Sequence, residues 1–206
     1  MTSPRVSIVT PSYQQAAYLE ETIRSVLDQH YPNLEYWIID GGSQDGSVEI
    51  IRKYADQLAG WVSERDSGQA EAINKGFTRA TGEIVAWINS DDYYLPGAIQ
   101  AAVDLLEQHP DVALVYGDVV AINGEGEVIN VQHFKQMGLD DLMQFKIIGQ
   151  PSVFMRRSVL EKAGFLDLSY HYLLDHELWL RLMQHAAMLY TPQRWSVARY
   201  HAAAKN

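Results

Sequence analysis

Short apolar runs rich in β-branched and aromatic residues recur through the first 120 residues. Each run has the length of a buried strand, and the strands we predict are 6–10, 35–40, 60–63, 83–88 and 112–120. Three of these runs are almost continuously apolar, which is typical of strands that are covered on both faces of a sheet.

The segments between these runs carry apolar residues at helical spacing. This pattern predicts helices over 16–29, 47–58, 68–80 and 97–109. Ser47 and Ser67 are suitable capping residues for two of them, and Gly82 follows the end of the third. Strands that alternate with helices predict an α/β fold, with a parallel sheet and helices on both of its faces.

The pattern changes after residue 120. A glycine-rich loop predicts a hairpin over 119–131, and further apolar spacing predicts a short helix at 139–145. Residues 149–164 predict a strand and then a helix from Ser158, and residues 175–184 predict a last helix. Because no repeat, low-complexity segment or linker separates the two halves, we expect one domain with one continuous sheet.

Composition narrows the class of protein. The chain has 206 residues, enough for a single domain with a sizeable core, and its net charge of -10 argues against a nucleic-acid partner. It has no cysteine, which fits a reducing compartment. We expect no signal peptide and no transmembrane segment, since no apolar run approaches the roughly 20 residues that span a bilayer.

Polar side chains collect where the predicted strands end. In open parallel sheets, ligands bind outside the carboxyl ends of the strands. Asp40 ends a buried strand with no basic residue nearby, and Asp66 follows the next strand. Simpler roles remain open here: Asp45 and Ser47 fit a turn and a helix cap, and Asp66 fits a helix start.

Asp91 and Asp92 follow the apolar run 83–88 directly. Two adjacent carboxylates repel each other, and a plain turn before Pro96 gains nothing from the pair. A divalent cation bound between them and an anionic ligand would explain it, because hard oxygen ligands suit Mg²⁺ or Mn²⁺.

The order of several segments resembles one known family. The segments are VSIVTPSYQQAAYLEETIRSVLDQ, IIDGGSQDGS, SERDSGQAEAINKGFTRATGEIVAWINSDD and DHELWLRL. They resemble the inverting, nucleotide-sugar-dependent glycosyltransferases of family 2, which have a GT-A fold, and the resemblance runs from residue 5 to about 182. It implies a Rossmann-like, mostly parallel sheet in a single domain, 1–206, with a nucleotide-binding half at 1–120 and an acceptor-binding half at 121–206.

The resemblance implies roles on the donor side. Pro11 and Tyr13 resemble the part that frames the nucleotide base, and Asp40 resembles the acid that hydrogen-bonds it. Relatives often carry a second acid where this chain has Gly41. A further segment resembles the family's "D-x-G…N-K-G" pattern near the donor, with Asp66, Gly68, Asn74 and Lys75. Lys75 would help to neutralise phosphate, although an exposed helical lysine is the simpler alternative.

The sequence NSDD resembles the family's DxD-type metal motif. Asp91 would face the ribose or the metal, and Asp92 would bind the metal that bridges the two phosphates. Asn89 stands where many relatives have another aspartate. His201 lies where some GT-A enzymes have a late histidine that completes the metal site.

Asp175 resembles the catalytic base of the family's "E-D-x-x-L-W" motif, with Leu174 in place of the first acid. The alternative is that Asp175 caps a helix beginning at His176. A full capping box would need Glu or Gln at position 178, which is Leu178, and this favours the catalytic role. Acceptor contacts would come from 133–175, including His133, Gln150 and His171.

The resemblance therefore implies metal-dependent transfer of a sugar, with inversion, to an acceptor hydroxyl. The donor would be a nucleoside diphosphate sugar, by default a UDP-sugar, and the cofactor Mg²⁺ or Mn²⁺. The acceptor would be a saccharide or glycoconjugate, as in synthesis of cell-envelope polysaccharides, and the enzyme would be cytoplasmic or peripheral at the inner face of the membrane. The alternatives are a sugar nucleotidyltransferase, whose Gly-rich start has no counterpart here, and a non-catalytic nucleotide-sugar or glycan-binding module.

Overall fold

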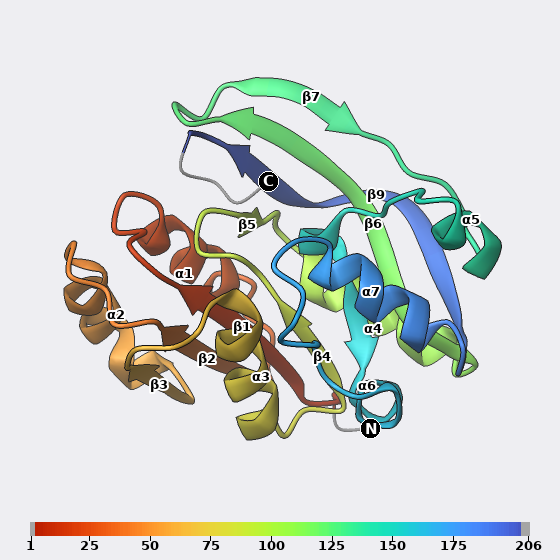
Figure 1. Ribbon diagram of the computed structural model, residues 1–206, viewed down its shortest axis with the longest axis horizontal. Helices are drawn as coiled ribbons and strands as arrows, with labels where there is room; N and C mark the ends of the chain where they lie inside the picture. Colours follow the sequence, from red (N-terminus) through yellow and green to blue (C-terminus); the bar gives the residue numbers. More distant parts are fainter. Residues whose placement is uncertain (1–2, 203–206) are drawn as a thin grey trace.

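One sheet runs through the whole computed structural model, which describes residues 3–202 (Figure 1). Within these residues the strand order is β3-β2-β1-β4-β8-β6-β9-β5, and β7 pairs with β6. The strands are β1 Val6–Ser12, β2 Leu34–Asp40, β3 Gly60–Ser63, β4 Ile84–Trp87, β5 Tyr93–Tyr94, β6 Val112–Asn123, β7 Val128–Gln132, β8 Phe154–Arg156 and β9 Ala187–Tyr200. The sheet is continuous across both halves, as the sequence predicted.

The helices lie close to the predicted bounds. They are α1 Leu19–Leu27, α2 Ser47–Tyr54, α3 Gln69–Arg79, α4 Ala98–Gln108, α5 Leu139–Met143, α6 Arg157–Ala163 and α7 Leu174–Leu182, with short 3₁₀ helices η1 Ala55–Gln57 and η2 Gln150–Ser152. None of the helices within residues 3–202 is long and apolar enough to cross a membrane.

The first half of the sheet is parallel. β1 pairs in parallel with both β2 and β4, and β2 pairs in parallel with β3. The register sets Ser12 beside Asp40 and Asp40 beside Ser63. The polar ends of these strands therefore lie at one edge of the sheet, where the sequence predicted a ligand site.

The second half of the sheet is mixed rather than parallel. β8 runs antiparallel to both β4 and β6, while β9 runs parallel to β6 and antiparallel to β5. Strands β5 and β9 were not predicted from the sequence. β9 lies beside β6 in Figure 1, and its last residues bond to the turn that follows β4, since Arg199 N donates to Asp92 and His201 lies against Asp91.

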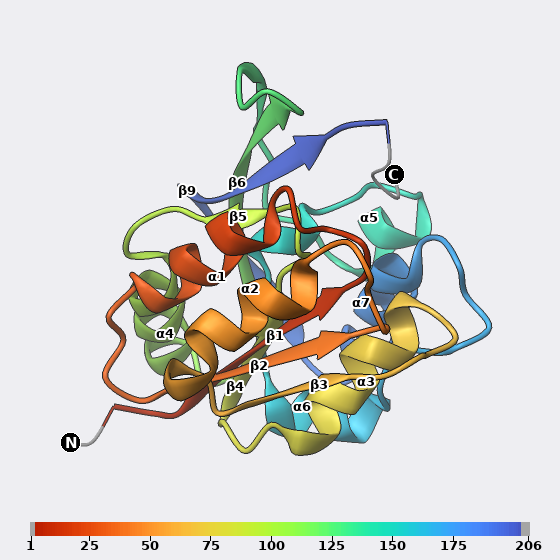
Figure 2. The ribbon, with the colours of Figure 1, turned by 90° about the vertical axis from the view of Figure 1, so that its left-hand side faces the viewer.

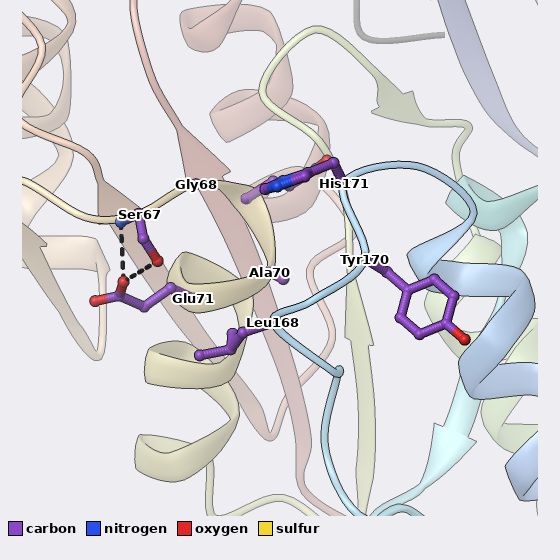
Figure 3. A pocket seen from close by; sticks show the side chains of 8 residues that line it. Ser67, Gly68, Ala70, Glu71, Leu168, Tyr170 and His171 are labelled. Carbon is purple, nitrogen blue, oxygen red and sulfur yellow. Dashed lines mark hydrogen bonds between the residues drawn. The ribbon is translucent and has the colours of Figure 1, made fainter.

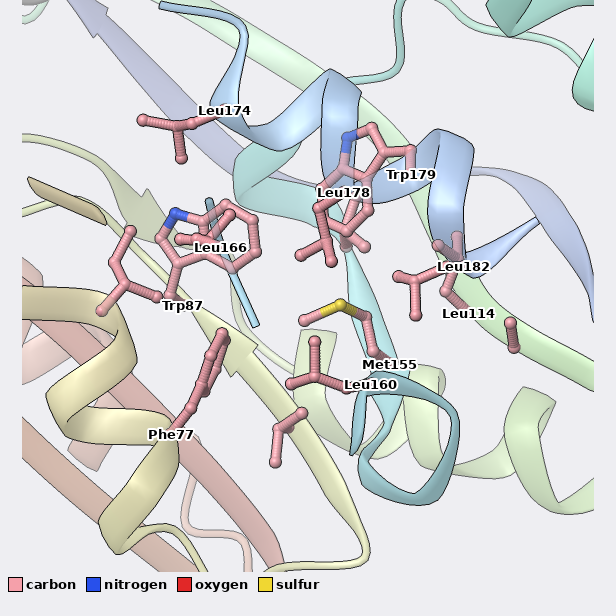
Figure 4. Close-up of a cluster of buried hydrophobic side chains, with 14 of the residues drawn as sticks. Phe77, Trp87, Leu114, Met155, Leu160, Leu166, Leu174, Leu178, Trp179 and Leu182 are labelled. Carbon is pink, nitrogen blue, oxygen red and sulfur yellow. The ribbon is translucent and has the colours of Figure 1, made fainter. Parts of the chain in front are cut away.

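Helices cover both faces of the sheet, as predicted. One core packs α3, α5, α6 and α7 against the sheet, and the other packs α1, α2 and α4. Figure 2 shows α1 and α2 on one side of β1 and β2, with α3 on the other. In the first core, Trp87 of β4 stacks on Trp179 of α7 with ring centroids 5.3 Å apart, which joins the two halves (Figure 4). Aromatic pairs of this kind add about 0.5–1.5 kcal/mol to the burial itself.

Candidate active site

The carboxylate of Asp40 organises the loop that follows β2. It is fully buried and accepts hydrogen bonds from the amides of Gly42 and Ser43, at 3.0 and 2.9 Å. The hydroxyls of Ser43 and Ser63 donate to it at 2.5 and 2.7 Å. These bonds compensate the cost of burying the charge and tie the loop to β3. Contact of Asp40 with a nucleotide base stays a prediction.

Gly41 lies between two of the predicted nucleotide-binding residues. A Cβ atom at this position would lie 3.1 Å from Asp66 Oδ2 and 3.2 Å from Tyr13 Cδ2. Tyr13 is exposed, and Pro11 lies in β1 just before it. The side chains of Asp66 and Tyr13 thus both lie close to Gly41.

The environment of Asp66 raises the pKa of its carboxyl group above the ordinary value. Burial raises the pKa of its carboxyl group, and the neighbouring acids Glu71 and Asp40 act in the same direction. The Gly68 amide, which donates to Asp66 at 3.0 Å, opposes this shift.

Two residues of the segment after Asp66 are engaged within the protein. The amide of Asn74 donates to Leu166 O and accepts from Leu166 N, at 2.7 and 3.0 Å. The ammonium group of Lys75 pairs with Glu71 and Glu64 at 2.9 and 3.0 Å. Asn74 therefore clamps a loop of the second half to α3, and Lys75 is held by carboxylates. A role for Lys75 toward phosphate stays a prediction.

Asp91 and His201 come together at the end of β4. His201 Nε2 lies 3.1 Å from Asp91 Oδ2, and each side chain is only about one-tenth exposed. The ring of Tyr18 contacts His201 with a centroid distance of 4.7 Å. An imidazole and a carboxylate held side by side from distant parts of the chain form a candidate pair of metal ligands.

Asp92 points into the protein. Asp92 Oδ1 accepts a hydrogen bond from the Arg199 amide at 2.9 Å, and Oδ2 accepts one from Asn89 at 3.3 Å. Burial raises the pKa of this carboxyl group to about 8, and the adjacent charge of Asp91 adds to the shift. Asp92 thus joins the turn after β4 to β9, whereas Asp91 lies beside His201.

Arg199 is a residue of this region that sequence reasoning missed. Its side chain is buried, donates to Asp91 O at 3.2 Å and pairs with Glu21 of α1. Its guanidinium group also lies over the ring of Tyr18, 4.7 Å from the centroid. Arg199 thus fixes the acidic turn against α1. The available signal was one arginine in an otherwise apolar run near the end of the chain.

Three side-chain amides form a chain of hydrogen bonds next to the acidic turn after β4. Gln69 donates to Asn89 Oδ1 at 2.7 Å, Asn89 donates to Gln150 Oε1 at 3.3 Å, and Gln150 donates to Trp87 O at 2.8 Å. An aspartate at position 89 could not donate to Gln150. The amide at this position therefore connects α3, the acidic turn and η2.

Asp175 lies in the first turn of α7, which begins at Leu174 and has Leu173 as its N-cap. The alternative that Asp175 caps a helix starting at His176 is therefore wrong. Burial raises the pKa of its carboxyl group, while the backbone amides of residues 175 and 176 oppose the rise. A half-buried carboxylate with a raised pKa suits a general base.

The three candidate acceptor residues lie in different surroundings. Gln150 belongs to the amide chain, and His133 Nδ1 bonds to the buried carboxylate of Asp118 at 2.6 Å. His171 borders a small hollow of about 20 Å³ between the start of α3 and the loop before α7, together with Leu168 and Tyr170 (Figure 3). The loop before α7 therefore lies close to Ser67 and Gly68, next to Asp66.

Solved structures share this fold. The chain superposes on Staphylococcus aureus TarS 1–349, solved with UDP-GlcNAc, with a TM-score of 0.79 over 97% of this chain and 60% of that one, at 18% identity. The mannosyltransferase PcManGT from Pyrobaculum calidifontis, solved with GDP-Man and Mn²⁺, gives a TM-score of 0.72 over 100% of this chain and 59% of that one, at 22% identity. The protein therefore has the GT-A fold of nucleotide-sugar glycosyltransferases.

Sequence comparison identifies the family. Residues 7–164 match the profile of glycosyl transferase family 2, and the chain belongs to that family. It is 30% identical over 186 residues to the putative teichuronic acid biosynthesis glycosyltransferase TuaG of Bacillus subtilis, covering 88% of this chain and 73% of TuaG. It is 27% identical over 210 residues to the uncharacterized glycosyltransferase RP339 of Rickettsia prowazekii, covering 98% of this chain and 65% of that protein.

Proposed function

We propose that the protein is a metal-dependent, inverting glycosyltransferase that moves a sugar from a nucleoside diphosphate sugar, first of all a UDP-sugar, to an acceptor hydroxyl. The observation that carries the proposal is the pairing of Asp91 with His201 at 3.1 Å, at the edge where the parallel strands end. Membership of the family and the nucleotide sugars bound by TarS and PcManGT support it.

The residues present fit a divalent cation. Within residues 3–202 no cluster of three or more histidine, cysteine or acidic side chains could hold a metal alone. Asp91 and His201 would supply two ligands and the donor diphosphate the others, as in many phosphate-bound Mg²⁺ sites. Because one ligand is an imidazole, Mn²⁺ is the first ion to test. Asp92 stays a predicted ligand of the metal, and its bonds to Arg199 and Asn89 would also hold the turn in place.

The proposed reaction assigns separate roles to the cation and to the carboxylates. A bound cation neutralises the negative charge that develops on the leaving diphosphate. Asp175 would accept the proton of the attacking hydroxyl group, a contribution of about 10²–10⁴-fold in rate. Attack from the side opposite the diphosphate inverts the anomeric carbon. Pro11 and Tyr13 would frame the base and Asp40 would contact it, with Asp66 near the donor, in the nucleotide-binding half 1–120. The half 121–206 would bind the acceptor.

The test is a calorimetric titration of UDP in Mn²⁺ and in EDTA. We expect binding to be tighter in Mn²⁺ by about tenfold or more, because the site offers two ligands and the diphosphate needs a counter-charge. Equal affinity in both solutions would refute the metal-bridged site. Slow release of UDP from a UDP-sugar, seen only with metal, separates a transferase from a non-catalytic binding module.

Besides the non-catalytic binding module, a sugar nucleotidyltransferase is the second alternative to a glycosyltransferase. It would form pyrophosphate from a nucleoside triphosphate and a sugar phosphate, so pyrophosphate release distinguishes it. A role in synthesis of a cell-envelope polysaccharide or glycoconjugate, in the cytoplasm or at the inner face of the membrane, belongs to the same proposal. The name of TuaG points in that direction for a relative.

A further inference from the structure

Exposed apolar side chains gather on two segments that flank Asp175. We call these six side chains the apolar rim: Met143, Phe145 and Ile147, from the last residue of α5 onward, and Leu168, Tyr170 and Leu173 before α7. Single exposed apolar residues are normal on protein surfaces, but a cluster beside a candidate catalytic group marks an interaction site.

Contacts at the start of α7 join the two segments. His176 Nε2 lies 3.0 Å from Leu142 O, and the ring of Phe145 stacks on the ring of His176 with centroids 5.8 Å apart. Leu173 immediately precedes the helix as its N-cap. Asp175 therefore lies between Leu173, which precedes α7, and His176, on whose ring Phe145 stacks.

Two members of the apolar rim are held in a strained backbone conformation. Phe145 and Leu173 have φ of 59° and 56°, in the left-handed region that large side chains rarely adopt. Phe145 is nevertheless 71% exposed, so burial does not explain the strain. Such strain persists where the surrounding structure imposes it and is concentrated at functional sites.

The charge of these two segments argues against an anionic bilayer surface as the partner that covers the apolar rim. Residues 139–147 contain one lysine, Lys146, which already bonds to Asp141 at 2.6 Å, and two aspartates. Residues 166–173 contain Asp167 and no lysine or arginine. Adsorption to an anionic bilayer requires basic clusters, which these segments lack. A second copy of the chain covering the apolar rim would also close the approach to Asp175.

We infer that the apolar rim binds the aliphatic chain of a lipid-linked saccharide acceptor, whose hydroxyl group is thereby presented to Asp175. The inference rests on the proposed function and specifies its acceptor class. The aliphatic chain of the acceptor packs against the two segments of the apolar rim, which include Phe145 on one side and Leu168 and Tyr170 on the other. Its sugar reaches the carboxylate of Asp175 between the two segments.

The experiment compares octyl and methyl β-D-glucopyranoside, both below micelle-forming concentration, by NMR titration of the whole protein. We expect the octyl glycoside to bind about tenfold or more tightly than the methyl glycoside. Phe145→Ser/Ile147→Ser and, on the other segment, Leu168→Ser/Tyr170→Ser should each weaken octyl binding by about fivefold or more. The second double variant keeps the test valid if the first disturbs the packing on His176.

The matched control is Val128→Ser/Ile129→Ser on β7, which replaces two comparably exposed apolar residues, 66% and 59% exposed, outside the apolar rim. It should bind the octyl glycoside like the wild type. With UDP and Mn²⁺ bound, the anomeric proton of the glycoside should relax faster than the terminal methyl group, because the sugar end faces the donor site.

Four results would overturn the inference. The first is equal binding of the two glycosides, and the second is an equal loss of octyl glycoside binding in the control variant. The third is binding of the wild type, but not of the rim variants, to vesicles that contain no glycolipid. The fourth is a wild-type dimer that dissociates in the rim variants. If UDP and Mn²⁺ fail to bind the wild type, the proposed transferase function is wrong and the acceptor assignment falls with it. If they bind and chain length has no effect, only the present inference is wrong.

Discussion

The imidazole of His201 lies 3.1 Å from the carboxylate of Asp91, although 110 positions separate the two residues in the sequence. β9 creates this pairing, because it runs parallel to β6, pairs with β5 and ends beside the turn after β4. Arg199, two residues before His201, bonds to that turn through both its backbone amide and its guanidinium group. The end of β9 thus places Arg199, which holds the acidic turn, and His201, a candidate metal ligand, beside that turn.

His201→Ala should weaken UDP binding in Mn²⁺ by about 10- to 100-fold and leave binding in EDTA unchanged, because it removes a metal ligand and no nucleotide contact. Calorimetry in the two solutions measures both values. His109→Ala, an exposed histidine at the end of α4, is the matched control. Equal losses in Mn²⁺ and EDTA would mean that His201 supports the turn rather than the metal.

Asp40→Ala should lower the free energy of unfolding by about 2–4 kcal/mol. The reason is that the buried amides and hydroxyls that donate hydrogen bonds to its carboxylate would lose their acceptor. If Asp40 also contacts the base, uridine and UDP should lose affinity by the same factor. Denaturant titration gives the stability, and calorimetry well below the melting temperature gives the affinities.

Asp45→Ala is the control for Asp40, since Asp45 also accepts bonds from a loop, from the amides of Ala16 and Ser47. It should lose stability but keep uridine affinity. A loss confined to UDP in the Asp40 variant would place Asp40 with the metal site instead of the base.

Asp118 should make stability depend on acid pH. Burial raises the pKa of its carboxyl group, but bonds from Phe134 N, Tyr190 and His133 outweigh this and leave the pKa below 3.8. A lowered pKa means that the stabilisation is present above pH 3.8 and is lost as the pH falls through the folded-state value. Asp118→Asn should therefore be less stable at pH 7, by about 1–3 kcal/mol, and should lose less stability between pH 5 and pH 3.

Denaturation curves at several pH values test this, and Asp104→Asn on the exposed face of α4 is the control. The account of Asp118 is wrong if the stabilities of wild type and Asp118→Asn change in parallel over the acid range.

The apolar pattern predicted the parallel half of the fold well, because each buried strand there is a short apolar run bounded by turn residues. β9 escaped prediction for a physical reason. Its middle contains Pro192, Gln193 and Arg194, all exposed, and proline within a run argues against a strand. β5 has only two residues and exists through its pairing with β9.

The candidate site was predictable as a set of residues but not as a geometry. Asp91 and Asp92 are adjacent in the sequence, yet only the structure places one beside His201 and the other against the Arg199 amide. Lys75 was suggested as a phosphate contact, and the structure pairs it with Glu64 and Glu71. Such partners depend on side-chain contacts between distant elements, which local spacing does not encode.

Asp175→Asn should abolish most turnover without unfolding the protein. The amide keeps the shape and can still accept the backbone amide bonds at the start of α7, but it cannot accept a proton. We expect kcat, measured as release of nucleoside diphosphate, to fall by about 100-fold or more, with donor KM little changed. Because burial raises the pKa of Asp175, its ionisation costs stability as the pH rises through the folded-state value, so the variant should be at least as stable as the wild type at pH 7.

The pH profile separates a catalytic base from a structural acid. A base must be ionised, so wild-type kcat/KM should fall as the pH drops through a pKa above the ordinary aspartate value of 3.8, and this limb should be absent from the residual activity of Asp175→Asn. Asp167→Asn is the comparison, because Asp167 is the next acid to consider as the base and instead bonds to the Ser169 amide at 2.9 Å. A large stability loss with near-normal turnover in Asp175→Asn, together with a turnover loss in Asp167→Asn, would assign the base to Asp167.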